Sequence, residues 1–188
     1  SVPGAGKTTM VYGTFAYFSS KEIQEVSKIL MIGPKNSFLS WKQEFNNVFG
    51  NKRNLKVLDI HAKDFSSEML YKNISQYNLI LINYEALPSY KDALRRIIDK
   101  STLLVFDEVH KIKRIDSERS KIAIELSQNT PYRIVLTGTP IPNNYQDIWN
   151  FLHILYGIEY DQYFGFSLTK LNNIVGTDIE DINNKLSP

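Results

Sequence analysis

The chain has 188 residues, of which 43% are hydrophobic and 22% charged, the balance of a soluble globular protein. Lys and Arg (22) nearly cancel Asp and Glu (20), so a polyanionic partner would have to meet a local basic patch and not a bulk positive charge. The sequence has no cysteine, which excludes disulfides and cysteine-ligated metal sites, and it shows neither a signal-peptide pattern nor a membrane-spanning apolar run. We therefore expect an intracellular, cytoplasmic protein without membrane contact.

The first element is a glycine-rich loop, S-V-P-G-A-G-K-T-T, that runs into a helical stretch. Gly4 and Gly6 would let successive N–H groups point at phosphate oxygens. Lys7 would then reach the β- and γ-phosphates, and the Thr8 hydroxyl would ligate Mg²⁺. The alternative is a helix-capping glycine turn that binds no ligand. Such a loop normally follows a buried strand, and we expect that strand to lie outside this sequence.

Short apolar, β-branched runs recur along the chain, with helical patterns between them. Most runs are continuously apolar, which is typical of strands that are covered on both faces. Strands that alternate with helices predict an α/β fold with a mainly parallel sheet, helices on both faces and right-handed crossovers. The expected strands are 28–33, 56–60, 78–83, 102–106 and 132–136.

Two segments carry apolar residues at helical spacing, and we expect both tryptophans in the core. After about Gly157 the pattern fades, so we expect 1–156 to form one lobe and 157–188 to form a C-terminal appendage. The predicted apolar faces are Phe38, Trp41, Phe45 and Val48 in 37–49, and Ile148, Phe151, Leu152 and Leu155 in 144–156, next to Trp149.

Each expected strand is followed by its most unusual residues. G-P-K follows the first run, N-Y-E the third, D-E-V-H the fourth and T-G-T-P the last. In an open parallel sheet, ligands bind beyond the carboxyl ends of the strands. These motifs are therefore expected to meet along one edge of the sheet, where they would form a binding site.

D-E-V-H follows five apolar residues and offers two carboxylates with different tasks. Asp107, at the strand's end, can hold Mg²⁺ through a water, and Glu108 can polarise the water that attacks the γ-phosphate. The alternative is a solvated acidic turn, which the preceding apolar run and the phosphate loop disfavour. Taken alone, His110 is more typical of a structural histidine than of a participant in coupling.

The remaining motifs are less specific. Thr137 and Thr139 follow the last strand and are candidates for transmitting the nucleotide state, in a segment that also reads as a Gly/Pro turn. Lys35 and its neighbours Asn36 and Ser37 could take a nucleic-acid phosphate, with helix N-capping as the alternative. Tyr84 and Glu85 are expected to serve in packing and capping, and K-I-K-R (111–114) as a solvated face.

In this order the motifs resemble the first RecA-like lobe of superfamily-two helicases. The likeness is closer to the Swi/Snf-type DNA-translocating ATPases, including bacterial and phage members. It rests on P-G-A-G-K-T, I-G-P-K-N-S-F-L-S-W-K-Q-E-F, I-N-Y-E-A-L, D-E-V-H and L-T-G-T-P-I-P-N-N-Y-Q-D-I-W-N-F-L-H-I-L. Ser1-Val2-Pro3 stands in place of a common acidic pair, Pro142 in place of Gln and Val109 in place of Ala, so the chain resembles a divergent member.

The resemblance implies ATP and Mg²⁺ as cofactors, double-stranded DNA as a partner, and a second RecA-like lobe of the same polypeptide. Carried onto this sequence, it implies catalytic roles for Lys7, Asp107 and Glu108 and a magnesium site at Thr8 and Asp107. The implied nucleotide contacts are Gly4, Ala5, Gly6, Lys7, Thr8 and Thr9; the coupling residues are His110, Thr137, Gly138 and Thr139; and the duplex contacts are Pro34 and Lys35.

The resemblance thus predicts the ATP-binding lobe of a monomeric DNA-dependent ATPase that moves along duplex DNA. Because the family's second lobe supplies arginine fingers, we expect weak nucleotide binding and little turnover from these 188 residues alone. Two alternatives remain open. One is an RNA-directed or restriction-type helicase motor, and the other is a non-hydrolysing nucleotide-binding or protein-interaction module.

Overall fold

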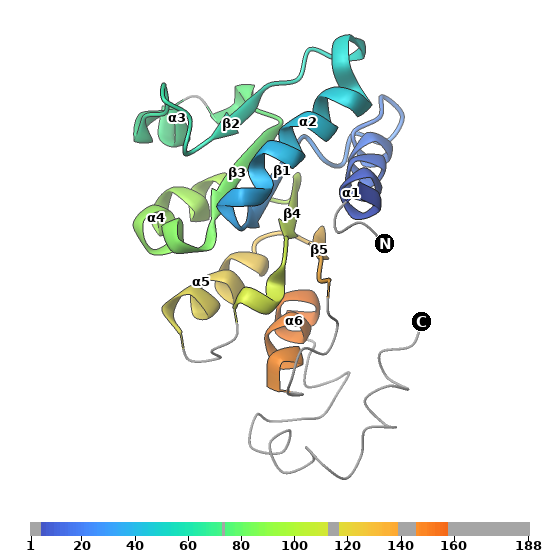
Figure 1. Cartoon of the computed structure of the whole chain (residues 1–188). Helices are drawn as coiled ribbons and strands as arrows, with labels where there is room; N and C mark the ends of the chain where they lie inside the picture. Colours follow the sequence, from blue (N-terminus) through green and yellow to red (C-terminus); the bar gives the residue numbers. More distant parts are fainter. Residues whose placement is uncertain (1–4, 73, 113–116, 139–145, 158–188) are drawn as a thin grey trace, which may run out of the picture.

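The computed structural model of the chain describes residues 5–72, 74–112, 117–138 and 146–157 (Figure 1). Within these residues a five-stranded sheet runs in the order β2-β3-β1-β4-β5, and every pairing is parallel. The predicted α/β fold with a parallel sheet is confirmed. The strands are β1 (Lys28–Gly33), β2 (Val57–Asp59), β3 (Leu79–Asn83), β4 (Thr102–Phe106) and β5 (Arg133–Val135).

The three central strands form the core of the molecule. Every residue of β1, β3 and β4 is buried, and Met31 of β1 lies opposite Leu81 on one side and Val105 on the other. Burying each large aliphatic side chain stabilises the fold by about 1.5–3 kcal/mol. The uninterrupted apolar runs in the sequence therefore have their cause here, because both faces of these strands are covered.

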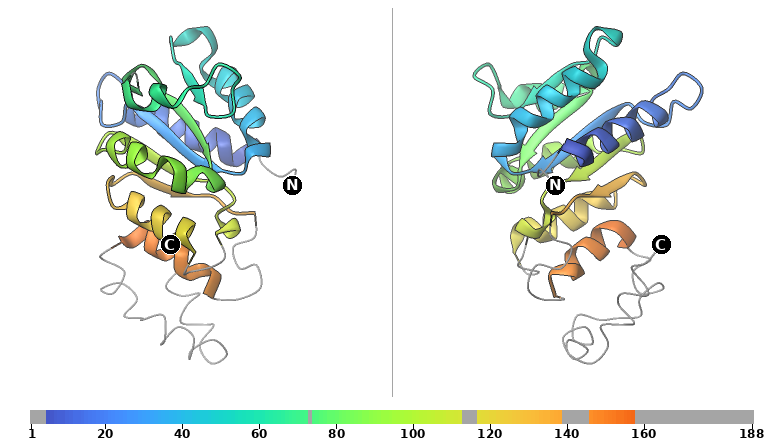
Figure 2. Two further views of the ribbon diagram at one scale, coloured as in Figure 1. Left: turned by 90° about the vertical axis from the view of Figure 1, so that its left-hand side faces the viewer. Right: turned by 45° about the vertical axis from the view of Figure 1, so that its right-hand side comes forward.

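Helices cover both faces of the sheet, as the sequence predicts. In Figure 2, α1 (Ala5–Phe18) and α2 (Phe38–Phe49) lie over one face, and α4 (Leu87–Ile97) and α5 (Glu118–Ser127) lie over the other. The short α3 (Ser67–Lys72) contacts α4, and α6 (Gln146–Tyr156) contacts α5 and β5. Single 3₁₀ turns are η1 (Lys35–Ser37), η2 (Gly50–Lys52), η3 (Ile74–Gln76), η4 (Tyr84–Ala86) and η5 (Val109–Lys111).

An aromatic cluster joins α1 to α2. Phe38, Trp41 and Phe45 are buried on α2, as predicted, and Phe49 completes the buried face where the sequence pattern pointed to the half-buried Val48. From α1, the Tyr12 ring meets the rings of Trp41, Phe45 and Phe49 edge-on, with centroids 5.5, 5.4 and 5.8 Å away. Such edge contacts add about 0.5–1.5 kcal/mol each beyond area burial, so they hold the two helices in fixed positions.

The predicted apolar face of α6 is partly wrong. Leu152 is buried as expected, but Ile154 is fully buried while Leu155 is only half-buried. The reason is that α6 packs against both α5 and β5, which widens and turns its contact face. Gly4, Thr139, the side chains of 146–150 and residues 158–188 of the predicted appendage lie outside the described residues. No helix in the described part of the chain is long and apolar enough to cross a membrane.

Candidate functional site

A cavity of about 280 Å³ lies at the carboxyl edge of the sheet, where the first turn of α1, the start of α2 and the ends of β4 and β5 meet. Parallel strands place all their carboxyl ends at one edge, so residues far apart in the sequence reach the same space. The lining residues are Lys7, Thr8, Asn36, Ser37, Ser40, Trp41, Asp107, Glu108, His110 and Gly138.

The phosphate-loop residues from Ala5 to Thr8 lie in the first turn of α1, at the positive end of the helix dipole. The Lys7 ammonium donates to the backbone oxygen of Thr137 at 2.7 Å, and this uses one of its three donors. Thr8 is buried, and a Cβ added at Gly6 would meet no atom within 4 Å. Space for a phosphate is therefore left in front of this turn.

Asp107 directly follows β4 and is held by three different elements. Its N–H donates to the Ile32 oxygen at 2.8 Å, and its own carbonyl oxygen accepts from the Tyr84 hydroxyl at 2.7 Å. Its carboxylate atom Oδ2 accepts from the indole Nε1 of Trp41 at 2.9 Å. A Cβ at Gly33 would lie 2.9 Å from the Asp107 Cβ, so a glycine is required for this close approach.

The Tyr84 hydroxyl is a permanent donor at this point. Its side chain is 3% exposed, and burial raises the pKa of Tyr84 well above its ordinary value. The nearby carboxylates of Asp107, Glu108 and Glu85 raise the pKa further, because a phenolate there would be repelled. The packing role that the sequence predicts for Tyr84 is correct, and its hydrogen bond to Asp107 was missed.

Glu108 adopts a left-handed backbone conformation, with φ 48° and ψ 48°. This region costs a residue with a Cβ roughly 1–2 kcal/mol. The turn is maintained by its neighbours, because the Val109 N–H donates to the Leu136 oxygen at 3.1 Å. Backbone strain of this kind is concentrated at functional sites, and here it turns the carboxylate out of the strand direction into the cavity lining.

Thr137 contacts both halves of the site. Its backbone oxygen accepts from Lys7, and its hydroxyl lies 3.4 Å from Nδ1 of His110. Gly138 lines the cavity, and a Cβ there would lie 3.9 Å from the Lys7 ammonium. Two of the four predicted coupling residues, Thr137 and Gly138, therefore lie between Lys7 and the acidic turn, and a third, His110, belongs to that turn.

The segment between β1 and α2 differs from one of its two sequence interpretations, helix capping by Ser37. Ser37 stands at the N-cap position of α2, but its hydroxyl donates to the Pro34 oxygen at 2.9 Å and does not cap the helix. The capping alternative is therefore wrong for Ser37, because the 3₁₀ turn places that hydroxyl next to Pro34. Lys35 is exposed and Pro34 is buried, while Asn36 and Ser37 line the cavity.

Thr9, a predicted nucleotide contact, is directed elsewhere. It does not belong to the cavity lining, and its hydroxyl donates to Glu44 Oε1 on α2 at 2.7 Å. By contrast, Ser40 and Trp41 line the cavity and were not predicted there. A buried indole N–H needs an acceptor, and that requirement is the signal in the sequence that could have drawn attention to Trp41.

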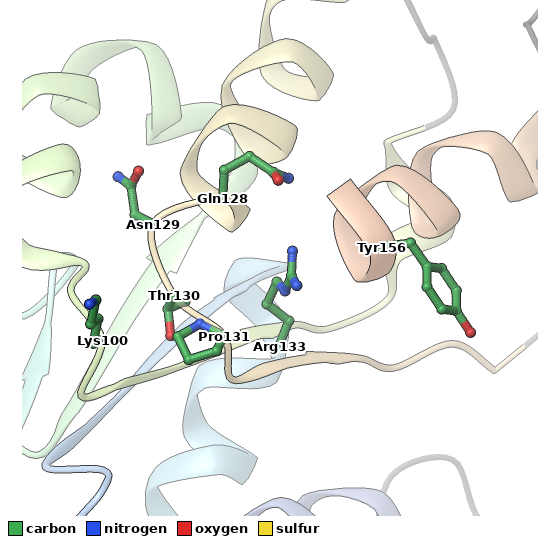
Figure 3. Close-up of a pocket in the computed structure, with 7 residues that line it drawn as sticks. All are labelled: Lys100, Gln128, Asn129, Thr130, Pro131, Arg133 and Tyr156. Carbon is green, nitrogen blue, oxygen red and sulfur yellow. The ribbon is translucent and has the colours of Figure 1, made fainter. Parts of the chain in front are cut away.

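A larger hollow, about 520 Å³, lies at the opposite edge of the sheet (Figure 3). It contains none of the motif residues. Its cations are Lys100 and Arg133. They share the lining with the carboxyl ends of α5 and α6, at Gln128 and Tyr156, where positive charge would offset the helix dipoles. The lining residues are Lys100, Gln128, Asn129, Thr130, Pro131, Arg133 and Tyr156.

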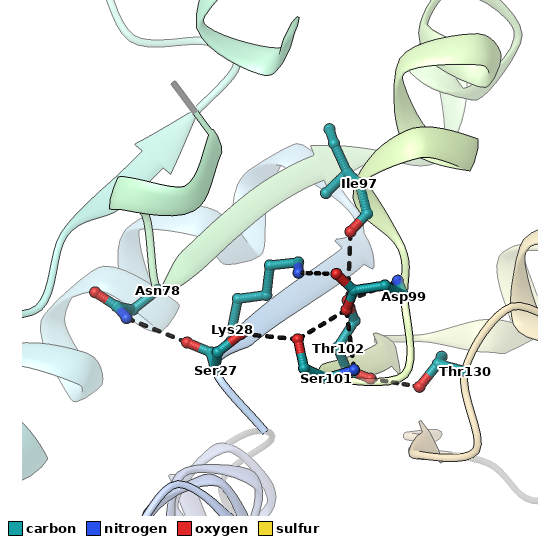
Figure 4. A network of polar contacts seen from close by, with 8 residues as sticks. All are labelled: Ser27, Lys28, Asn78, Ile97, Asp99, Ser101, Thr102 and Thr130. Carbon is teal, nitrogen blue, oxygen red and sulfur yellow. Dashed lines mark hydrogen bonds and ion pairs between the residues drawn. The ribbon is translucent and has the colours of Figure 1, made fainter. Parts of the chain in front are cut away.

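Polar side chains at this amino edge bind one another (Figure 4). The Lys28 ammonium contacts Asp99 Oδ2 at 2.9 Å, Ser101 and Thr102 donate to Oδ1 of the same carboxylate, and Thr130 donates to the Thr102 oxygen at 2.6 Å. Burial by itself would raise the pKa of Asp99, but the hydrogen bonds from Lys28 and Ser101 and the Lys28 charge lower it to about 2. The network joins the loops that precede β1, β4 and β5.

The carboxyl-edge cavity has the donor set of a Mg²⁺–nucleotide site. Among the described residues, no three His, Cys, Asp or Glu side chains gather to hold a metal by themselves. Magnesium does not need such a group, because it is usually bound by one or two carboxylates, waters and the phosphates of the substrate. One hydroxyl (Thr8), one carboxylate (Asp107) and one ammonium with two further donors (Lys7) line the same cavity and fit that requirement.

The fold and the site define a RecA-like helicase domain of the P-loop class. The structure is similar to the SWI2/SNF2 ATPase core of Sulfolobus solfataricus in complex with double-stranded DNA, with a TM-score of 0.74 and 25% identity over 99% of this chain and 37% of that chain. The fold is also that of the Pyrococcus furiosus Hef helicase domain, with a TM-score of 0.61 and 23% identity over 81% of this chain and 31% of that one.

The chain belongs to the SNF2-related domain family, whose family model matches residues 3–184. It is 30% identical over 157 residues to the ISWI chromatin-remodeling complex ATPase ISW2 of Saccharomyces cerevisiae. The matched region covers 81% of this chain and 13% of the relative. It is 33% identical over 124 residues to human DNA repair and recombination protein RAD54B, and this match covers 66% of this chain and 13% of that relative. The Swi/Snf-type resemblance is confirmed.

Proposed function

We propose that this chain is the ATP-binding lobe of a DNA-dependent ATPase that moves along duplex DNA. The single observation that carries the proposal is that Lys7, Thr8, Asp107 and Glu108 line one cavity at the carboxyl edge of the sheet. Membership of the SNF2-related family supports ATP as the ligand. The similarity to an ATPase core bound to double-stranded DNA supports duplex DNA as the partner.

In the proposed reaction, each residue has a task that its position allows. Bound Mg²⁺·ATP supplies the γ-phosphoryl group and a cation that neutralises the charge developing on it. Lys7 has two donors beyond its bond to Thr137, and these would hold phosphate oxygens. The Thr8 hydroxyl and the Asp107 carboxylate would hold the metal. Glu108 would orient the attacking water and accept its proton.

The contacts of Thr137 offer a means of coupling. Phosphate oxygens and the Thr137 carbonyl would compete for the same Lys7 ammonium. Binding and release of phosphate would therefore weaken and restore the hydrogen bond between Lys7 and Thr137. Its hydroxyl meets His110 beside the acidic turn. We propose that this pair, with Gly138 and Thr139, transmits the nucleotide state to the segment that follows β5.

The proposal extends to the parts that complete the motor. The chain spans 13% of the length of ISW2 and 37% of the DNA-bound ATPase core. We propose that residues 1–156 form the first lobe and that 157–188 lead towards a second lobe that closes the site. The exposed Lys35 would contact a DNA phosphate, whereas the buried Pro34 would shape the backbone that presents it.

The test uses the protein at its natural length, with variants Lys7→Ala and Glu108→Gln and the matched lysine control Lys100→Ala at the opposite edge. ATP hydrolysis and nucleotide affinity are measured with duplex DNA, single-stranded DNA and RNA. Glu108→Gln is expected to keep ATP binding and lose turnover by roughly 100-fold or more, because it removes the proton acceptor. Lys7→Ala is expected to weaken both binding and turnover, and Lys100→Ala neither.

Each other outcome favours a different function. If Glu108→Gln hydrolysed ATP at the unchanged rate, Glu108 would not be the base that accepts the proton of the attacking water. Stimulation by RNA or single strands but not by duplex DNA would favour a helicase of another type. Nucleotide binding without turnover on any nucleic acid would favour a non-hydrolysing module.

A further inference from the structure

We propose that Trp41 is a positioning residue that sets the orientation of the Asp107 carboxylate and thereby tunes magnesium binding. The inference rests on the proposed nucleotide site. The Trp41 side chain is 1% exposed, and its indole Nε1 donates to Asp107 Oδ2 at 2.9 Å across 66 residues of sequence. An indole has one N–H donor and no acceptor, so its whole hydrogen-bonding capacity is used on this carboxylate.

The geometry leaves one carboxylate oxygen for the metal. The backbone N–H and C=O of Asp107 are held by Ile32 and Tyr84, which fix the start of the side chain. Trp41 then fixes rotation about the remaining bonds by binding Oδ2. Among the described residues no hydrogen-bond donor meets Oδ1, so that atom can accept from magnesium-bound water on the cavity side.

Trp41 also connects the two predicted magnesium ligands. The Tyr12 hydroxyl on α1 donates to the Trp41 carbonyl at 2.6 Å, and the two rings meet edge-on at 5.5 Å. Helix α1 carries Thr8 in its first turn, whereas Asp107 lies at the end of β4. A displacement of α1 or α2 would therefore change the position of the indole and, through it, the orientation of the carboxylate.

A purely structural role would give a different result. A buried indole must find an acceptor wherever it lies, and the loss of that bond would then lower stability alone. Residues that orient a metal ligand change metal affinity when they are replaced, typically by 10- to 100-fold. The dependence of nucleotide affinity on Mg²⁺ separates the two roles, because general destabilisation does not distinguish nucleotide with magnesium from nucleotide without it.

The experiment compares Trp41→Phe with Trp149→Phe, the same substitution at the other tryptophan of the chain, in α6. Affinity for a fluorescent ATP analogue is measured with Mg²⁺ and with excess chelator, and thermal unfolding is measured alongside. Phe keeps an aromatic ring against Tyr12 but removes the donor. We expect the gain in affinity on adding Mg²⁺ to fall roughly 10-fold in Trp41→Phe, with chelator affinity unchanged. Trp149→Phe should keep the full gain.

A second measurement covers the case in which Trp41→Phe fails to fold. In a Trp149→Phe variant in which any tryptophan outside these 188 residues is also replaced by Phe, Trp41 is the one remaining tryptophan, so its emission reports on the site. We expect Mg²⁺·ADP to change this emission more than ADP with chelator does, because magnesium binding shifts the carboxylate that the indole contacts. Equal emission changes in both conditions, or an undiminished magnesium effect in folded Trp41→Phe, would overturn the proposal.

The two proposals can fail separately. If Lys7→Ala leaves nucleotide affinity intact, the nucleotide site is in the wrong place and the role of Trp41 fails with it. If Lys7→Ala abolishes binding while Trp41→Phe responds normally to Mg²⁺, the nucleotide site stands and Trp41 is a structural residue.

Discussion

The two edges of one sheet use polar residues in opposite ways. At the amino edge, Lys28, Asp99 and Thr102 bind one another across loops, and their side chains satisfy each other. At the carboxyl edge, Lys7 and Glu108 line a cavity, and Glu108 does so from a strained left-handed backbone. The size of a hollow therefore does not identify the site, since the larger one lies at the edge where the polar groups are already paired.

The amino edge contributes stability, and the carboxyl edge contributes the candidate binding site. Hydrogen-bonded groups that satisfy one another lower the cost of burial and add stability, about 0.5–1.5 kcal/mol net for each bond. Groups that line a cavity also form bonds within the protein, but they can in addition contact a ligand. Substitutions at the amino edge should therefore change stability and leave turnover alone, whereas substitutions at the carboxyl edge should change turnover more than stability.

Among substitutions outside the residues proposed to be catalytic, the largest effect on turnover is expected from Gly33→Ala. The new Cβ would lie 2.9 Å from the Asp107 Cβ and 2.8 Å from the flexible Met31 sulfur. The sulfur can move aside, but the Asp107 Cβ is fixed to the backbone, so the carboxylate would be displaced. A misplacement of about 1 Å costs roughly 100-fold in rate. The measurement is kcat for ATP hydrolysis at saturating nucleotide.

Gly13→Ala is the matched control, because a Cβ at that helical position meets no atom within 4 Å. It should leave kcat unchanged and raise helix stability by up to about 1 kcal/mol. If Gly33→Ala and Gly13→Ala had the same kcat for ATP hydrolysis, the close approach of β1 to Asp107 would not matter for turnover.

A smaller loss of activity, together with a loss of stability, is expected when one hydroxyl is removed at the carboxyl edge. The matched control removes one hydroxyl at the amino edge. Tyr84→Phe removes the donor to the Asp107 carbonyl, and Thr130→Val removes the donor to the Thr102 carbonyl. Each is expected to lower the free energy of unfolding by about 1–2 kcal/mol in urea titrations, because a buried acceptor loses its partner. Only Tyr84→Phe should also lower kcat. Equal activity losses in the two variants would remove the functional distinction between the edges.

Glu108→Gly is expected to stabilise the protein while it abolishes turnover. Glycine adopts the left-handed conformation without the Cβ penalty, so the gain is about 1 kcal/mol. Gln24 shares the positive φ, at 53°, and lies away from the site, so Gln24→Gly should stabilise similarly and keep full activity. Thermal unfolding and ATP hydrolysis measure both. Destabilisation by Glu108→Gly would contradict the assignment of strain.

The smallest effect is expected from Asp99→Asn and depends on pH. The pKa of Asp99 is lowered from 3.8 to about 2 in the folded protein. A depressed pKa stabilises the fold above the unfolded value, and this contribution is lost as pH falls through about 2. Because the Asp99 side chain is 55% exposed, water screens the pair and the loss at pH 7 should be about 1 kcal/mol or less. Urea midpoints of the variant and the unchanged protein should converge between pH 4 and about 2, and a constant difference would contradict this.

Much of the fold follows from local pattern. The strands 28–33 and 102–106 begin and end where the sequence predicts, because each is a continuous apolar run with polar or glycine boundaries. The other three are one or two residues shorter than expected, because their pairing with neighbouring strands covers less than the stretch that the sequence pattern indicates. The order of the strands has no local signal, because parallel pairing joins segments that are far apart in the chain.

The site could be predicted in its residues but not in its contacts. Lys7, Thr8, Asp107 and Glu108 belong to motifs whose chemistry is readable from residue type and spacing. The Trp41–Asp107 bond, the need for glycine at 33 and the left-handed turn at Glu108 depend on how distant elements approach one another. The spacing of residues along the chain does not predict how these distant elements approach one another.

The most direct test is amide hydrogen exchange of the protein at its natural length, with and without Mg²⁺·ATP. We expect new protection in the first turns of α1, in the acidic turn from 107 to 110 and in 136–138, all of which lie at the carboxyl edge. The amino-edge loops around 99–102 and 128–133 should exchange at unchanged rates. Protection confined to the amino edge would place the ligand in the larger hollow and contradict nucleotide binding in the carboxyl-edge cavity.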